Sequence, residues 1–237
     1  MTILYDIASF CEAFQQQVAA IEEMKLELIP VKELAHVQLY KKSLVMSAID
    51  TLAGYRFTKE AYKELNQHNK KRLIRFIAEF AEWKSGPAIS VPYLFDQLAR
   101  RELKDCELYA ALHSKLVKYE GNAEGTILLV EDVDVMAAEL FELAKTEYEE
   151  QLILKSQHYS LLYEYRNCKT NGLSESGGLM EVFQYARPNY YSNTISEHHG
   201  LKQWQLSYPL AHFNNLFSHS LKNMKKYFIK ANINPYE

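Results

Sequence analysis

The segment Leu161–Asn171, with the sequence LLYEYRNCKTN, holds the residues whose types and spacing are best suited to chemistry. Arg166 can hold a phosphate through two parallel hydrogen bonds, because the guanidinium group presents its donors as a planar fork. Asn167 and Asn171 are four residues apart, so in a helix their side-chain amides lie on one face, close to that arginine. The pattern therefore predicts an anion-binding site at the end of a helix.

This segment resembles the HEPN superfamily, helical bundles whose ribonuclease members carry an Arg, usually followed by a polar residue, and a His four to six positions later. The resemblance implies that the His does acid–base chemistry on the ribose 2′-hydroxyl and that the Arg steadies the phosphate. It also implies that no metal is needed and that two copies of the motif meet across a dimer. The resemblance covers Leu161–Asn171 and, more loosely, Asp132–Gly178.

The chain departs from this pattern at one position. Arg166 and Asn167 match it, but Asn171 stands where the His is expected, and an amide does not exchange a proton near neutral pH as an imidazole does. The resemblance thus predicts a remnant that binds RNA or a toxin–antitoxin-type partner. If the chain is an enzyme, the resemblance implies a metal-independent ribonuclease.

A structural role for the same residues stays open. Arg166 can pair with a carboxylate such as Glu164 or with one from another helix, while Asn167 or Asn171 ends the helix near Gly172. Another histidine of the same helix is poorly placed to take the role of the missing His. His158 lies eight residues upstream, roughly 12 Å away along a helix axis. His198 and His199 can approach only through tertiary folding or from a second subunit.

Basic residues form two further candidate binding surfaces. One is the run HNKKRLIR, and the other is a lysine at every fourth position of the last predicted helix, which builds a ridge able to follow a phosphate backbone. The alternative for both is the ordinary solvated face of an amphipathic helix. The predicted binding residues are Lys70, Lys71, Arg72, Arg75, Lys222, Lys226 and Lys230.

An acidic segment balances these basic runs. Residues 131–150 contain eight carboxylates and the single basic residue Lys145, which suits a protein partner or self-association. The formal net charge of the 237-residue chain is only −3, which argues against a dedicated, strongly basic nucleic-acid binder but not against a local basic surface.

Several classes of protein are disfavoured. The three cysteines are widely spaced and form no C-x-x-C pair, as in a protein with reduced thiols in the cytoplasm. Glu197, His198 and His199 are consecutive, so their side chains diverge, and no H-E-x-x-H helix accompanies them. The sequence also lacks a P-loop, a G-x-G-x-x-G and a G-x-S-x-G elbow. We therefore predict no metal and no cofactor, and no apolar run approaches the ~18 residues that span a bilayer.

The periodicity of apolar residues predicts a mainly α fold, a helical bundle with a small β-hairpin near the C-terminus. Helices are expected over residues 33–57, through the stripe from Leu73 to Trp83, after an N-cap at Ser90, after an N-cap at Asp105, over residues 132–167, and after Pro209. The expected core stripe of the first comprises Leu34, Val37, Leu44, Val45, Ala48, Leu52 and Tyr55. That of the last comprises Phe213, Phe217, Leu221, Met224 and Phe228. Aromatic, alternating residues at 188–195 and 202–208 predict the hairpin.

We expect residues 1–237 to form a single helical domain, with a core bundle over 33–180 and a hairpin plus C-terminal helix over 185–237. The alternative to the HEPN-like function is a non-enzymatic protein-interaction or homodimerising module, in which the aromatic hairpin and the last helix form the binding surface. Either function implies a homo-oligomer or a protein partner.

Overall fold

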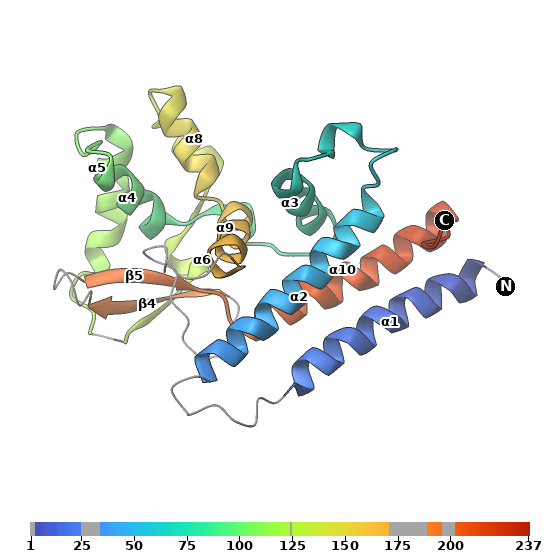
Figure 1. Cartoon of the computed structure of the whole chain (residues 1–237). Helices are drawn as coiled ribbons and strands as arrows, with labels where there is room; N and C mark the ends of the chain where they lie inside the picture. The colour runs from blue at the N-terminus through green and yellow to red at the C-terminus, as the bar shows by residue number, and fades with distance from the viewer. Residues whose placement is uncertain (1–2, 25–33, 124, 171–188, 196–201) are drawn as a thin grey trace. The chain divides into compact units, whose positions relative to one another are not determined.

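The computed structural model describes residues 3–24, 34–123, 125–170, 189–195 and 202–237 (Figure 1). The fold is mainly α with two small antiparallel sheets, one of which contains the hairpin near the C-terminus, as the sequence predicts. Its contacts form two compact units: unit 1 combines residues 1–83 with 210–237, and unit 2 comprises residues 84–209. This division differs from the predicted segments, a core bundle over 33–180 and a hairpin plus C-terminal helix over 185–237. The hairpin belongs to unit 2, whereas the last helix belongs to unit 1.

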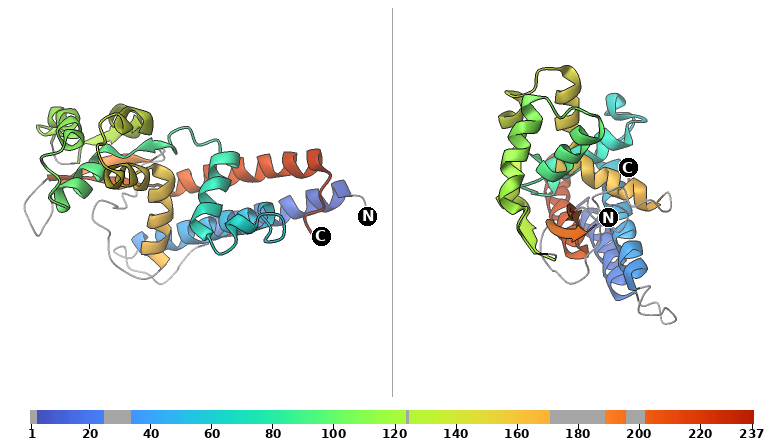
Figure 2. Two further views of the ribbon diagram at one scale, coloured as in Figure 1. Left: turned by 90° about the horizontal axis from the view of Figure 1, so that it is seen from above. Right: turned by 90° about the vertical axis from the view of Figure 1, so that its left-hand side faces the viewer.

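All the regular elements among the described residues of unit 1 are helices. Three long helices run side by side, and the first runs antiparallel to the other two (Figures 1 and 2). A shorter helix packs against the second and the last of them. The elements of unit 1 are α1 (Ile3–Glu23), α2 (Leu34–Arg56), the 3-10 turn η2 (Lys63–Leu65), α3 (Asn69–Phe80) and α10 (Leu210–Ala231).

The core of unit 1 is built from aromatic and aliphatic stripes on these helices. Phe10 of α1 meets Phe228 of α10 edge to face, with ring centroids 5.6 Å apart. The stripe predicted for α10 is confirmed, because all five of its residues are buried. That predicted for α2 is partly wrong: Leu44 and Tyr55 are about two-fifths exposed, and Ile49 and Ala53 are buried instead. The buried residues of α2 are thus shifted around the helix from the predicted stripe.

Unit 2 surrounds its short strands with short helices. Its elements are β1 (Ala88–Ile89), α4 (Val91–Arg100), α5 (Glu107–Leu116), the 3-10 turn η3 (Val117–Tyr119), β2 (Ile127–Leu129), α6 (Val130–Val133), β3 (Val135–Met136), α7 (Ala137–Phe141), α8 (Glu147–Lys155), α9 (His158–Thr170), β4 (Tyr190–Ile195) and β5 (Lys202–Ser207). Strand β4 pairs with β5 as the predicted hairpin and with β2 on its other edge, while β1 pairs with β3.

The single helix predicted over residues 132–167 is wrong. The segment instead contains the end of α6, then β3, α7, α8 and most of α9. Its main break lies at Thr146, whose hydroxyl oxygen accepts a hydrogen bond from the Glu149 amide at 3.2 Å. The Glu149 carboxylate in turn accepts from the amides of Thr146 and Lys145 at 2.9 and 2.7 Å. This capping box starts a new helix, because it satisfies amides that an unbroken helix would have bonded internally.

Two predicted helix starts have different outcomes. Ser90 is the N-cap of α4, as predicted, and its hydroxyl oxygen accepts from the Tyr93 amide at 3.3 Å. The N-cap predicted at Asp105 is wrong by one residue: Cys106 occupies that position, where its sulfur accepts from the Tyr109 amide at 3.3 Å. The Cys106 thiol also donates to the Leu103 carbonyl oxygen, so its sulfur bonds to the backbone on both sides of the turn.

Candidate functional site

The structure places the predicted Arg166–Asn171 site only in part. Arg166 and Asn167 lie in the last turns of α9, beyond Tyr165, the last residue of that helix whose side chain is described. Asn171 lies outside the described residues, as do Glu197, His198 and His199. The helical placement of Arg166 and Asn167 agrees with the predicted helix end, and the geometry of the three side chains stays a prediction.

The arginines of the predicted α3 surface are held by acidic groups within unit 1. Arg72 pairs with Asp50 at 3.3 Å, and Arg75 pairs with Glu79 at 2.8 Å and with Glu64 at 3.5 Å. The hydrogen bond to Glu79 is the main cause that raises the pKa of the Arg75 guanidinium above its ordinary value. Carboxylates of unit 1 therefore already pair with these two guanidinium groups, and the lysines of this run are the exposed Lys71 and the half-buried Lys70.

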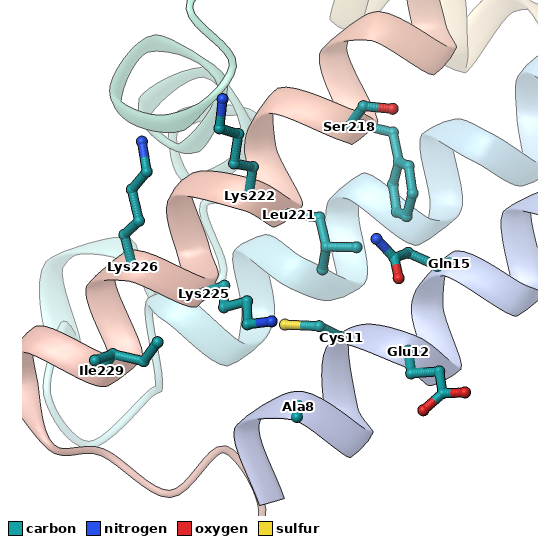
Figure 3. Close-up of a pocket in the computed structure, with 11 residues that line it drawn as sticks. Ala8, Cys11, Glu12, Gln15, Ser218, Leu221, Lys222, Lys225, Lys226 and Ile229 are labelled. Carbon is teal, nitrogen blue, oxygen red and sulfur yellow. The ribbon is translucent and has the colours of Figure 1, made fainter. Parts of the chain in front are cut away.

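The lysines predicted on α10 are exposed, and two of them line a groove between α1 and α10 (Figure 3). The groove has a volume of about 710 Å³. Lys222 and Lys226 lie along its α10 edge, joined by Lys225, whereas Lys230 continues the ridge beyond the lining. The complete lining comprises Ala8, Cys11, Glu12 and Gln15 of α1 with Phe217, Ser218, Leu221, Lys222, Lys225, Lys226 and Ile229 of α10.

Helical spacing explains why these residues share the groove. The α1 residues are separated by three, one and three positions, and those of α10 recur in the same rhythm, so each set forms one stripe along its helix. Sequence reasoning missed Lys225 because it followed only the four-residue spacing from Lys222. A lysine three positions away occupies the same face, and that spacing was the available signal.

The floor of the groove is apolar, and its edges are charged. Leu221 and Cys11 are buried, whereas Ile229 at one end is 47% exposed. Lys225 points across the groove towards the sulfur of Cys11 (Figure 3). Burial raises the pKa of the Cys11 thiol, and the positive charge of Lys225 opposes that effect. The surface thus offers an apolar contact next to ammonium groups.

Few acidic groups oppose the groove lysines within unit 1. Glu12 is the one carboxylate of the lining. Glu82 lies near Lys222 and Lys226, and its pKa is lowered chiefly by the hydrogen bond from Asn223 and further by nearby positive charges. Lys226 donates to the Asn223 side-chain oxygen at 3.2 Å, which is a neutral partner. Positive charge therefore exceeds negative charge along this edge.

A second polar cluster is buried in unit 2. The His158 Nε2 atom lies 2.6 Å from an oxygen of Asp134, and both side chains are at most 1% exposed. The Asp134 carboxylate also accepts from the Tyr191 hydroxyl at 2.7 Å and from the Val91 amide at 3.0 Å. Burial, followed by the charge of Asp134, raises the pKa of Tyr191 well above its ordinary value.

Further groups complete this buried network. The Tyr208 hydroxyl and the Asn189 amide lie 3.2 and 3.3 Å from His158 Nδ1, and the hydroxyl oxygens of Tyr191 and Ser90 are 2.8 Å apart. A Ser, a His and an Asp therefore share one cluster, in which Ser90 contacts Tyr191 and His158 contacts Asp134. All of these side chains are buried, so none presents an atom to a substrate in solution. The network joins the ends of α4, β3, α9, β4 and β5, which is a structural role.

The described residues hold no group of three His, Cys, Asp or Glu side chains arranged to bind a metal ion. Within the same residues, no helix combines the length and the apolar content that crossing a bilayer requires. No protein-family model matches this chain, and neither a curated protein nor a solved structure matches it.

Proposed function

We propose that the chain is a non-enzymatic interaction module and that it binds an acidic protein partner in the α1–α10 groove. The observation that carries this proposal is the pairing of three exposed lysines with an apolar floor in one groove of about 710 Å³. A phosphate backbone is strongly hydrated and gains nothing from covering the exposed Ile229 of the lining, whereas a peptide gains from that apolar contact and from neutralising the lysines together. A protein segment thus fits the chemistry of this surface better than RNA does.

The test compares three labelled probes by fluorescence anisotropy: poly-L-glutamate, a glutamate peptide with leucine at every third and fourth position, and single-stranded RNA. We expect the leucine-containing peptide to bind most tightly, because it alone uses both the lysines and the apolar floor. We expect its affinity to fall as salt screens the charges. RNA as the tightest ligand, or no binding by any probe, would overturn the proposal.

A triple variant assigns the binding to the groove. Changing Lys222, Lys225 and Lys226 to Glu reverses three exposed charges on one edge, and we expect it to weaken binding of the leucine-containing peptide by about tenfold or more. The matched control changes Lys59, Lys63 and Lys115 to Glu, which alters the net charge by the same amount at exposed positions outside the groove lining. Equal losses in both variants would show that net charge alone drives binding.

The HEPN-like function stays a second proposal, supported by the sequence motif and by the helical placement of Arg166 and Asn167. It predicts cleavage of labelled RNA without added metal, and loss of that cleavage in Arg166→Ala. It also predicts that Asn171→His increases cleavage, since imidazole supplies the proton transfer that the amide lacks. RNA that stays intact with both the natural chain and Asn171→His would reject this proposal.

A further inference from the structure

Unit 2 carries a surface whose chemistry complements the groove. Helix α8 exposes Glu147, Glu150, Gln151 and Leu154, which recur at the three- and four-residue spacing that places side chains on one face of a helix. Leu154 is 47% exposed, although it follows the buried pair Leu152 and Ile153. We call these four residues the acidic face of α8.

Other exposed groups extend the same chemistry. Helix α7, which contacts α8, exposes Glu139 and leaves Phe141 36% exposed, and its C-cap residue Glu142 is exposed as well. Lys145 lies between the two helices but pairs with Glu107 of α5 at 3.1 Å, so its charge has a carboxylate partner already. Lys155, the exposed last residue of α8, is basic, but the four exposed glutamates at α7 and α8 outnumber it. The region is therefore acidic overall and carries exposed apolar side chains, as a partner for the groove requires.

We propose, on the basis of the function proposed above, that the partner of the α1–α10 groove is a second copy of this chain, whose α8 lies in the groove with its acidic face towards α10. Glu147 and Glu150 then meet the lysine edge, and Leu154 covers the exposed Ile229 at the end of the groove. The pairing brings opposite charges together and removes an exposed leucine from water.

The dimensions of the two surfaces agree. Helix α8 has nine residues and is therefore about 13 Å long, whereas the α10 stripe from Ser218 to Ile229 spans about 17 Å. A groove between two neighbouring helices is a common docking site for a third helix, because its side chains enter the space between the ridges of the pair. The groove thus accommodates the full length of α8.

The first measurement is the mass of the natural chain in solution by sedimentation or light scattering. We expect a mass above the 27.6 kDa of one copy that rises with protein concentration at about 0.05 M salt and falls towards one copy at about 1 M, where charges are screened within a few ångströms. A mass of one copy at every protein concentration, even at low salt, would overturn the proposal. The same result is expected if α8 binds the groove of its own chain instead of a second copy, so that alternative is rejected by the same measurement only when the mass rises.

Charge exchange gives the sharper test. One variant carries Lys222→Glu, Lys225→Glu and Lys226→Glu, and the other carries Glu147→Lys and Glu150→Lys. Each alone places like charges on both surfaces, so we expect at least a tenfold loss of self-association. Mixed together, they restore opposite charges at every contact, and we expect the mass of the assembly to return. Association that persists in either single variant, or that fails to return in the mixture, would overturn the proposal.

Controls separate this inference from the function on which it rests. The variants Lys59→Glu/Lys63→Glu/Lys115→Glu and Glu23→Lys/Glu60→Lys change net charge at exposed positions outside both surfaces, and we expect them to associate like the natural chain. Far-ultraviolet circular dichroism of every variant verifies that it is folded. A natural chain that stays single but binds the leucine-containing glutamate peptide through its groove lysines would reject the second copy and leave the proposed function standing.

Discussion

Polar groups play opposite parts in the two units. In unit 2, Asp134 and His158 are almost completely buried, and neighbouring side chains and an amide satisfy their hydrogen bonds. In unit 1, Lys222, Lys225 and Lys226 are exposed along a groove whose lining contains a single carboxylate. The first set connects parts of the fold, and the second remains accessible to a ligand.

The physical reason lies in solvation. A charge or hydroxyl removed from water costs several kcal/mol unless the protein replaces its hydrogen bonds, so a buried network must be complete within the fold. An exposed ion pair contributes only about 0–1 kcal/mol, so the fold gains little from surface lysines. Residue types alone therefore do not indicate function: a Ser, a His and an Asp are structural in unit 2, whereas plain lysines form the candidate binding site in unit 1.

The largest effect is expected from removing Asp134. Asp134→Ala leaves His158, the Tyr191 hydroxyl and the Val91 amide without their acceptor in a buried site. Breaking such a buried pair costs about 3–5 kcal/mol. Urea unfolding followed by circular dichroism measures the loss, and the exposed neighbour Asp132→Ala is the matched control, with an expected change within about 0.5 kcal/mol.

Similar losses in the two variants, or none in either, would contradict the structural role of the network. Cleavage or hydrolytic activity that disappears in Asp134→Ala while the unfolding curve stays unchanged would likewise assign these residues to chemistry. The buried polar groups of unit 2 would then not be structural, and the contrast with the exposed lysines of unit 1 would fail.

A smaller effect is expected at Glu149, a buried carboxylate held by backbone amides. Burial raises its pKa, but hydrogen bonds from Lys145, Cys106 and Thr146 outweigh burial and leave the pKa below its ordinary value. A carboxylate whose pKa is lower in the folded state stabilises the fold above its unfolded pKa of about 4.3, and this stabilisation is lost as the pH falls through the lower folded value.

Glu149→Gln therefore tests this effect through pH. We expect the variant to be less stable than the natural chain by about 1 kcal/mol at pH 7, since the charged capping box is lost. The difference should shrink below pH 4 and vanish once Glu149 itself is protonated. Glu150→Gln, at the exposed adjacent position, should show at most about 0.3 kcal/mol. A difference that is independent of pH would show that Glu149 acts through packing instead.

Much of the fold could be predicted from the sequence, because apolar periodicity and local caps are strong signals. They identified α10 with its complete core stripe, the N-cap at Ser90 and both strands of the hairpin. The unbroken helix over 132–167 failed because apolar spacing alone does not locate a break. The T-x-x-E motif at Thr146–Glu149 marks that break and is readable in the sequence.

The two polar sites were less accessible to sequence reasoning. The Asp134–His158 network depends on residues 24 and 57 positions apart that only tertiary folding brings together. The lysines of α10 were predicted from their spacing, but the groove was not, since it requires α1 beside α10. A helical face follows from periodicity, whereas its neighbour in space does not.

The smallest effect on stability is expected from the groove lysines, and it completes the comparison. Changing Lys222, Lys225 and Lys226 to Glu removes exposed charges, and each such surface substitution is expected to change stability by no more than about 0.5 kcal/mol. Urea unfolding should therefore give a curve close to that of the natural chain, even where binding is lost. A loss comparable to that of Asp134→Ala would mean that the fold itself depends on these lysines, and the groove would no longer qualify as a binding surface. A small loss of stability together with a large loss of association separates binding from folding, because an exposed charge contributes little to the fold and can still exchange its water for a partner.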